Sequence, residues 1–264
     1  MVRNSPASDF TFGVHLKAAG RVGLVLGALA FSALQLSASP TTYTGEDIGV
    51  TGSGPLTNSN AAYNSFYSAA SGIGSVSLIT FESSSLGSFA SLTPATGVTL
   101  TGTDIFGNNQ TVRDTSNFPA NPSLDGSNTT PGGANFVEVQ GGTLTFTFAD
   151  PINSFGAYLT GVQNFTQDTI TFSDGSTQVI DVPETGTAGN IGAVDFVGFT
   201  DSGASISSIT IFAGNNGYDD IGVDDVSYGA AVSATPEPGS VVLLLTGCMA
   251  LGLLVWQRRA AQTR

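Results

Sequence analysis

Residues 143–148 read Thr-Leu-Thr-Phe-Thr-Phe, so a hydroxyl side chain alternates with an apolar one at every step. Successive side chains of a β-strand point to opposite faces of its sheet, which places Leu144, Phe146 and Phe148 together on one face. The threonines then share the other face. We therefore predict a strand with one face in a core and the other in water.

Short apolar segments of this kind continue from Leu78 onward and are separated by Gly, Asn, Asp and Ser. The pair 169–172 and 177–182 flanks Ser173-Asp174-Gly175-Ser176, and Asp-Gly favours the positive-φ turn of a β-hairpin. Further strands are expected at 152–159, 193–199, 207–212 and 222–228. The pattern predicts an all-β fold, an antiparallel β-sandwich that is jelly-roll-like.

Two segments depart from the strand pattern. One short N-terminal helix is expected at 60–70, which is rich in Ala and is capped by Asn58 or Ser59. Segment 102–133 has few periodic apolar residues and many Asn, Asp, Ser and Pro, so it is expected to form long loops. Loops of this length are commonly functional, and a disordered excursion is the alternative.

The charge of the chain is concentrated. The 264 residues include 34 glycines, and only 10% are charged, a balance typical of extracellular β-structure. Between Ser39 and Ala234 one arginine, Arg113, faces 18 of the 20 carboxylates, which gives this segment a formal charge of −17. Phosphate binding needs clustered Lys and Arg, so the sequence argues against a nucleic-acid partner.

Several catalytic chemistries lack their residues. The only histidine is His15, near the N-terminus, and the only cysteine is Cys248, in a C-terminal apolar segment. Segment 39–234 also has no lysine, which excludes His-dependent triads, His or Cys zinc sites and Schiff-base lysines from it. Paired carboxylates of the kind that hydrolyse glycosides remain available.

Aromatic platforms for a sugar ring are also few. The only tryptophan, Trp256, lies in the C-terminal apolar segment. Tyr158, Tyr218 and Phe118 are the weaker substitutes in the remainder of the chain.

The N-terminus has the order of a secretory signal peptide. Arg3, Lys17 and Arg21 precede the apolar segment 22–36, and small residues follow at 37–39. We predict a signal peptide at 1–38. The alternative is a membrane anchor, for which fifteen apolar residues are short.

The C-terminus ends in an apolar segment and a basic tail. Residues 239–256 carry no charge, and Arg258 and Arg259 follow them. We predict a transmembrane helix at 239–257 with a cytoplasmic basic tail at 258–264, because arginines beside a span stay in the cytoplasm. The preceding segment is then periplasmic. A buried core helix is the alternative.

The motif Pro236-Glu237-Pro238 stands immediately before this segment and follows a small polar linker that begins at residue 230. Together with Arg258 and Arg259, it resembles the PEP-CTERM sorting signal of Gram-negative bacteria that make extracellular polysaccharide. The resemblance implies processing by an exosortase, a membrane enzyme that acts near Pro-Glu-Pro. It also implies a protein that is first anchored in the inner membrane and then displayed at the cell surface or secreted.

We expect an N-terminal segment with the short helix at 39–74, followed by a β-sandwich at 75–229. A second, looser resemblance covers about residues 45–229. It rests on the Asn-Ser, Ala-rich helix, then Ile79-Thr80-Phe81-Glu82 near the first strand, and finally Val223-Asp224-Asp225-Val226 in the last one. The order of these motifs is similar to that of many PEP-CTERM proteins. It implies a jelly roll like that of carbohydrate-binding modules.

These motifs lead to a metal hypothesis. We expect a structural Ca²⁺ site joining the first and last strands, with Glu82 and Asp225 as ligands and Asp219, Asp220 or Asp224 as helpers, because Ca²⁺ takes six to eight oxygen ligands. Strand alternation from Val223 would turn Asp225 toward the core, where a carboxylate needs a partner. In the alternative, these carboxylates accept backbone hydrogen bonds or face water.

The function expected from these features is that of an exported, non-enzymatic envelope or extracellular-matrix protein that binds carbohydrate or exopolysaccharide. Two alternatives belong to other classes. One is a structural matrix protein with no specific ligand. The other is a carboxylate-dependent glycan hydrolase or lyase.

Overall fold

The computed structural model describes residues 39–115, 125–163, 167–183, 192–214, 219–230 and 238–262, and the side chains of the last segment from residue 246. The predicted signal peptide, 1–38, lies outside these residues. Pro236 and Glu237 of the predicted sorting motif also lie outside them.

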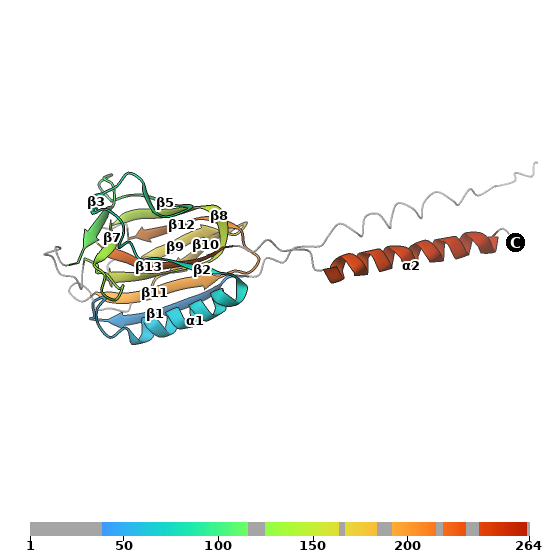
Figure 1. Cartoon of the computed structure of the whole chain (residues 1–264), viewed down its shortest axis with the longest axis horizontal. Coiled ribbons are helices and arrows are strands. Elements are labelled where there is room, and N and C mark those ends of the chain that lie inside the picture. Colours follow the sequence, from blue (N-terminus) through green and yellow to red (C-terminus); the bar gives the residue numbers. More distant parts are fainter. Residues whose placement is uncertain are drawn as a thin grey trace, which may run out of the picture. The chain divides into compact units, whose positions relative to one another are not determined.

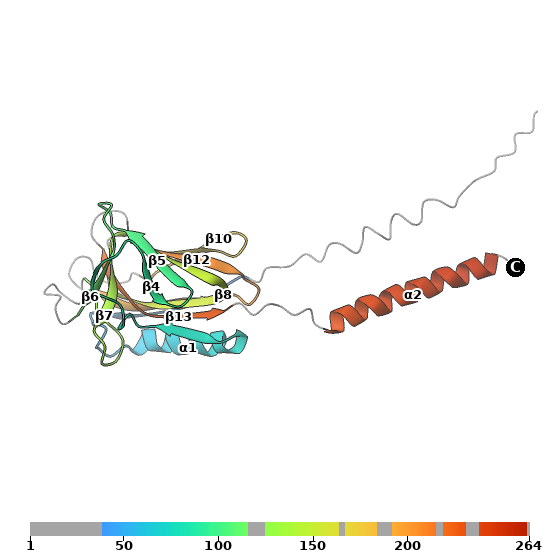
Figure 2. The same cartoon turned by 45° about the horizontal axis from the view of Figure 1, so that its top comes forward.

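One long strand, β8 (Gly142–Val162), organises the fold. Its first half pairs with β5 (Val98–Thr103) and β12 (Ile206–Ala213), and its second half pairs with β11 (Ala193–Thr200) and β13 (Asp220–Ala230). The pairings are antiparallel. Strand β8 therefore belongs to both layers of the antiparallel β-sandwich that the sequence predicts (Figures 1 and 2).

The two predicted strands at 143–148 and 152–159 are thus one strand. Pro151, which lies between them, has no N–H to donate. The pairing of β8 with β12 changes register at this point, between Thr147 and Ile152, so the proline interrupts the ladder without ending the strand.

The described strands fall into two layers. The first contains, in order, β10 (Thr177–Asp181), β9 (Thr169–Ser173), β12, the first half of β8, β5 and β4 (Leu92–Ala95). The second contains β1 (Thr41–Ile48), β11, the second half of β8 and β13, and then β2 (Val76–Ile79), β7 (Asn135–Gln140), β6 (Thr111–Asp114) and β3 (Gly87–Ser88).

The main core lies between the layers. Phe146 of the first layer and Phe155 of the second are both fully buried, and their ring centroids are 5.5 Å apart. Phe172 stacks on Phe199 at 3.9 Å. The predicted alternation in 143–148 is confirmed, because Leu144 is also buried whereas the threonines of this segment are half-buried or exposed.

The expected hairpin is present as β9 and β10, and Gly175 supplies the positive φ of its turn, +116°. Segment 102–133 is less irregular than predicted. It contains the strand β6, which pairs with β3 and β7.

Helix α1 (Thr57–Ile73) covers the outer face of the second layer, as Figure 2 shows. Phe66 and Ala70 of the helix pack with Tyr158, Val194 and Phe196 in a second apolar cluster. Strand β1, which the sequence did not predict, pairs with β11 beside this helix. Residues 39–74 are thereby built into the sandwich.

The predicted cap of this helix by Asn58 or Ser59 is wrong. The helix begins at Thr57, and Asp47 of β1 accepts the backbone N–H groups of Asn58 (3.0 Å) and Ser59 (2.9 Å). The hydroxyl of Ser59 also donates to Asp47. An ionised carboxylate is a stronger partner for a helix N-terminus than a neutral side chain, and Asp47 supplies it from a neighbouring strand.

The apolar segment at the C-terminus forms helix α2 (Pro238–Gln262). The membrane span predicted at 239–257 is not found: among the residues described, no helix has the length and hydropathy needed to cross a membrane.

Candidate ligand-binding groove

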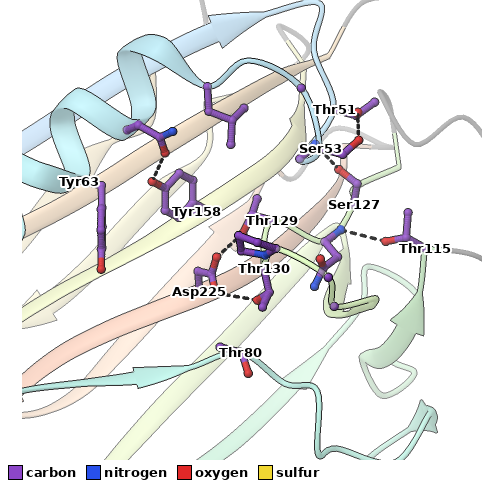
Figure 3. Close-up of a pocket in the computed structure, with 18 of the residues that line it drawn as sticks. Thr51, Ser53, Tyr63, Thr80, Thr115, Ser127, Thr129, Thr130, Tyr158 and Asp225 are labelled. Atoms are coloured by element: carbon purple, nitrogen blue, oxygen red, sulfur yellow. Dashed lines mark hydrogen bonds between the residues drawn. The ribbon is translucent and has the colours of Figure 1, made fainter.

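A groove of about 820 Å³ lies on the outer face of the second layer. Its walls are the turn 51–54 and the start of α1 on one side, and the loop 127–133 on the other; β2 and β13 also contribute residues (Figure 3). We call this site the outer groove. Its hydroxyl groups come from Thr51, Ser53, Thr80, Thr115, Ser127, Thr129 and Thr130, and its amides from Asn60, Asn64 and Asn128.

A β-bulge in β13 shapes the floor of the outer groove. Asp224 lies opposite Tyr158 of β8, but Ser227 lies opposite Gly156, so β13 contains one extra residue. Asp225 adopts the left-handed conformation there, with φ of +45°.

The bulge corrects the predicted orientation of Asp225. Val223 and Val226 are both buried in the main core, three residues apart instead of two or four. Asp224 and Asp225 therefore both point away from that core. Simple alternation would have turned Asp225 inward, beside Val223.

Asp224 holds the loop 127–133 on the sheet. Its Oδ2 accepts the backbone N–H of Thr129 (2.7 Å), that of Thr130 (3.2 Å) and the side-chain amide of Asn128 (3.0 Å). The carboxyl is fully buried, and its Oδ1 has no hydrogen-bond partner among the described residues. Burial, and secondarily the charge of Asp225, raises the pKa of Asp224 to about 7.

Asp225 presents its carboxylate to the outer groove. Thr130 Oγ1 donates to Oδ1 at 2.7 Å, and Thr129 Oγ1 donates to Oδ2 at 3.0 Å. Burial raises the pKa of Asp225, the two hydroxyls oppose this effect, and the charge of Glu82 adds to it. Among the described residues that line the outer groove, Asp225 is the only charged one.

Glu82 fixes the far end of the same loop. Its carboxylate accepts the backbone N–H groups of Ala134 (3.0 Å) and Asn135 (3.1 Å). Asn128 connects the two acidic positions, because its side-chain amide donates both to Glu82 Oε1 (2.8 Å) and to Asp224. The two sequence motifs, Glu82 near the first strand and Asp224-Asp225 in the last one, therefore lie close together. The amide of Asn128 connects them by hydrogen bonds.

Short side chains let the loop approach the sheet closely. A Cβ at Gly126, whose φ is +91°, would lie 2.4 Å from the backbone nitrogen of Gly222. Thr160 of β8 accepts the N–H of Ser127 at 2.7 Å, and Ser127 Oγ accepts the N–H of Gly52 at 2.9 Å. The loop is thus bound to the sheet on one side and to the turn 51–54 on the other.

The other predicted metal ligands lie elsewhere. Asp219 accepts the N–H of Gln163 at 3.0 Å, and Asp220 lies opposite Gln140 of β7, at the end of β13 away from Asp225. In the part of the chain that the structure describes, no group of three or more His, Cys, Asp or Glu side chains is placed to hold a metal ion. The Ca²⁺ site stays a prediction from the sequence.

Two tyrosines provide ring surface in the outer groove. Tyr63 of α1 is half-buried, and its ring centroid lies 5.8 Å from that of Tyr158 (Figure 3). Tyr158 is almost fully buried and donates its hydroxyl to Asn60 at 2.6 Å. Burial raises the pKa of both phenols, so both remain neutral hydrogen-bonding groups.

The sequence identified only part of this aromatic surface. Tyr158 lies at the outer groove as a candidate stacking residue should, but it is largely covered. Tyr218 and Phe118 lie outside the described residues. Tyr63 was missed, although Asn60, Tyr63 and Asn64 share one helix face at a spacing of three and four, the signal that would have grouped them.

No family model matches the sequence, and no curated protein matches it. Among solved structures, the K2 cleaved adhesin domain of Lys-gingipain is similar with a TM-score of 0.38 and 17% identity, over 58% of this chain and 97% of that one. The catalytic domain of a GH87 α-1,3-glucanase in complex with tetrasaccharides gives a TM-score of 0.33 and 14% identity over 62% of this chain, but only 30% of the glucanase domain is covered. TmCBM61 in complex with β-1,4-galactotriose gives a TM-score of 0.29 and 13% identity, over 57% of this chain and 94% of that one.

Proposed function

We propose that this chain is an exported, non-enzymatic envelope or matrix protein whose outer groove binds carbohydrate. One observation carries the proposal: a cavity of about 820 Å³ is lined by hydroxyls, amides and tyrosines, with one carboxylate among them. This volume lies within the ~300 to 1,000 Å³ of ordinary ligand sites.

The lining suits a polyhydroxylated ligand. Ser and Thr hydroxyls and Asn amides both donate and accept hydrogen bonds, as sugar hydroxyls do. The half-buried ring of Tyr63 offers an apolar face for the C–H side of a sugar ring. A purely apolar ligand would leave many of these polar groups without partners.

The placement of the carboxylates favours binding over hydrolysis. Glycosidases need two carboxyl groups that flank the scissile bond. Asp225 lines the outer groove, but Asp224 is fully buried beneath the loop and Glu82 is occupied by backbone N–H groups. Hydrolysis at this site would therefore lack its second group.

Export and sorting are the part of the proposal that rests on the sequence. The signal-peptide order at 1–38 and the order of Pro-Glu-Pro, apolar segment and Arg258-Arg259 support it. On this proposal, an exosortase-type enzyme recognises the tail and the sandwich acts outside the cytoplasm.

A glycan array probed with the purified chain tests the binding proposal. Tyr63→Ala should weaken binding about tenfold or more, whereas Tyr67→Ala should leave it unchanged, because Tyr67 lies one helical turn away and does not line the outer groove. Failure of the wild-type chain to bind any glycan would favour a structural matrix protein without a ligand. Equal losses in the two variants would place the binding site elsewhere.

A further inference from the structure

We infer that the outer groove selects its glycan by charge, with Asp225 as the specificity-determining residue. The class of ligand it fits is a glycan with a free amine, which is bound more tightly than the N-acetylated form of the same sugar, whereas acidic glycans are excluded. The inference rests on the proposed function and names the ligand class of the same site.

The first argument is the accessibility of the Asp225 carboxylate. Each of its oxygens accepts one threonine hydroxyl, Thr130 on Oδ1 and Thr129 on Oδ2. A carboxylate has about four acceptor positions, so two remain for a ligand. The side chain is half-buried at the floor of the outer groove, where an ammonium group could reach it (Figure 3).

The second argument is the backbone at this residue. Residues other than glycine rarely take a φ of +45°, although aspartate and asparagine do so more readily than other side chains, and such conformations are concentrated at functional sites. Glycine fits such a bulge most readily. The bulge and the two threonine hydroxyls hold an aspartate here, and they direct its carboxylate into the outer groove instead of the core.

The third argument is the charge around the site. Segment 39–234 has a formal charge of −17, and its one cation, Arg113, donates its Nε to Glu138 at 2.8 Å and does not line the outer groove. Glu82, whose carboxylate accepts the side-chain amide of Asn128, adds a second negative charge at the far end of the loop that forms the wall. The electrostatic potential in the outer groove therefore attracts an ammonium group and repels a uronate or sulfate.

Three hexasaccharides separate these classes: hexameric glucosamine, its fully N-acetylated form, and hexagalacturonate. Their affinities are measured by calorimetry in buffers from mildly acidic to neutral pH, because the amine must be protonated while Asp225, whose pKa burial raises, must be ionised. EDTA is present so that a divalent cation cannot bridge. We expect the wild-type chain to bind the glucosamine hexamer about tenfold tighter than its N-acetylated form. We expect no detectable binding of hexagalacturonate.

Two variants test whether Asp225 causes the preference for the free amine. Asp225→Asn keeps a side chain that tolerates positive φ, and it should bring the affinity ratio of the two glucosamine forms close to one while N-acetylated binding persists. Asp181→Asn removes the same charge from an exposed position on β10 and should leave the ratio unchanged.

The failures of the two proposals are distinguishable. An unchanged ratio in Asp225→Asn, an equal effect of Asp181→Asn, or binding of hexagalacturonate would overturn the charge inference. Binding that depends on Tyr63 but shows no charge preference would overturn it and leave the carbohydrate proposal standing. If none of the three hexasaccharides binds, the inference is wrong, and the glycan array then decides the proposed function.

Discussion

The hydroxyl of Thr130 donates to Oδ1 of Asp225 over 2.7 Å, and this bond connects the loop 127–133 to the bulge of β13. The two residues are 95 positions apart in the chain. The wall of the outer groove is thus held by polar side chains that meet only in the folded sandwich. Changes at the bulge should alter both stability and ligand binding.

Replacing Asp225 by valine should destabilise the sandwich by roughly 1–3 kcal/mol. A β-branched side chain is disfavoured at a φ of +45°, and the hydroxyls of Thr129 and Thr130 would lose the acceptors that Asp225 supplies, keeping only their longer contacts with Asp224 Oδ2 (3.1 and 3.4 Å). Asp225→Asn should cost much less. Urea denaturation of the two variants measures the difference, and equal losses would contradict the strain at this residue.

Gly52→Ala should separate the turn 51–54 from the loop. A Cβ at Gly52 would lie 2.0 Å from the carbonyl oxygen of Asn128, so the backbone of one segment must move. We expect lower thermal stability and weaker glycan binding. Gly72→Ala is the matched control because a Cβ there meets nothing within 4 Å, and in a helix it should stabilise by up to about 1 kcal/mol. Similar effects of the two substitutions would refute the docking of turn and loop.

Asp224 should make the sandwich less stable as the pH rises. Its folded-state pKa of about 7 lies above the ordinary value of 3.8, so between these values the folded chain keeps a proton that the unfolded chain releases. The contribution of Asp224 to the free energy of unfolding is therefore complete below pH 3.8, and it is lost as the pH rises through 7. The contribution is on the order of 4 kcal/mol.

Burial also raises the pKa values of Asp220 and Glu138, so these groups too lower the stability as the pH rises. Comparing wild type with Asp224→Asn separates the contribution of Asp224 from theirs. Free energies of unfolding measured from pH 4 to pH 8 should fall less steeply in the variant. An unchanged slope would show that Asp224 does not carry the buried proton.

Asp47→Ala should destabilise the sandwich by about 1–2 kcal/mol, because the carboxylate accepts two N–H groups at the start of α1. Burial raises the pKa of Asp47, but the hydrogen bonds from Ser59 and Asn58 outweigh this effect and the pKa is lowered. Asp47→Asn should cost less than Asp47→Ala in chemical denaturation. Full stability of Asp47→Ala would mean that the helix start is held by other contacts.

The strands were predictable where alternation and turn residues are both clear. The segment 143–148 and the Asp174-Gly175 hairpin show this, because period-two patterns depend only on local sequence. Strand β1 was not predictable: its sequence, Thr-Thr-Tyr-Thr-Gly-Glu-Asp-Ile, has few apolar residues, and it depends on β11 and α1 for its partners.

The outer groove was predictable only as separate motifs. Glu82 and Asp224-Asp225 were identified as neighbours, but a single extra residue in β13 reverses the face on which Asp225 lies, and only the register with β8 reveals it. The loop 127–133 looked irregular because its partners are distant in sequence. Asp224 of β13 accepts two backbone N–H groups of this loop, and these hydrogen bonds hold the loop in place as a wall of the site.

Amide hydrogen exchange of the chain, with and without the hexasaccharide that it binds most tightly, tests the central claim most directly. A carbohydrate site in the outer groove predicts slower exchange in 51–54 and 127–133, and loss of this protection in Tyr63→Ala. A second hollow of about 290 Å³ on the first layer, lined by Thr101, Thr103, Thr143 and Thr145, provides the internal comparison. Protection confined to that hollow, or unchanged exchange in both segments, would contradict the account.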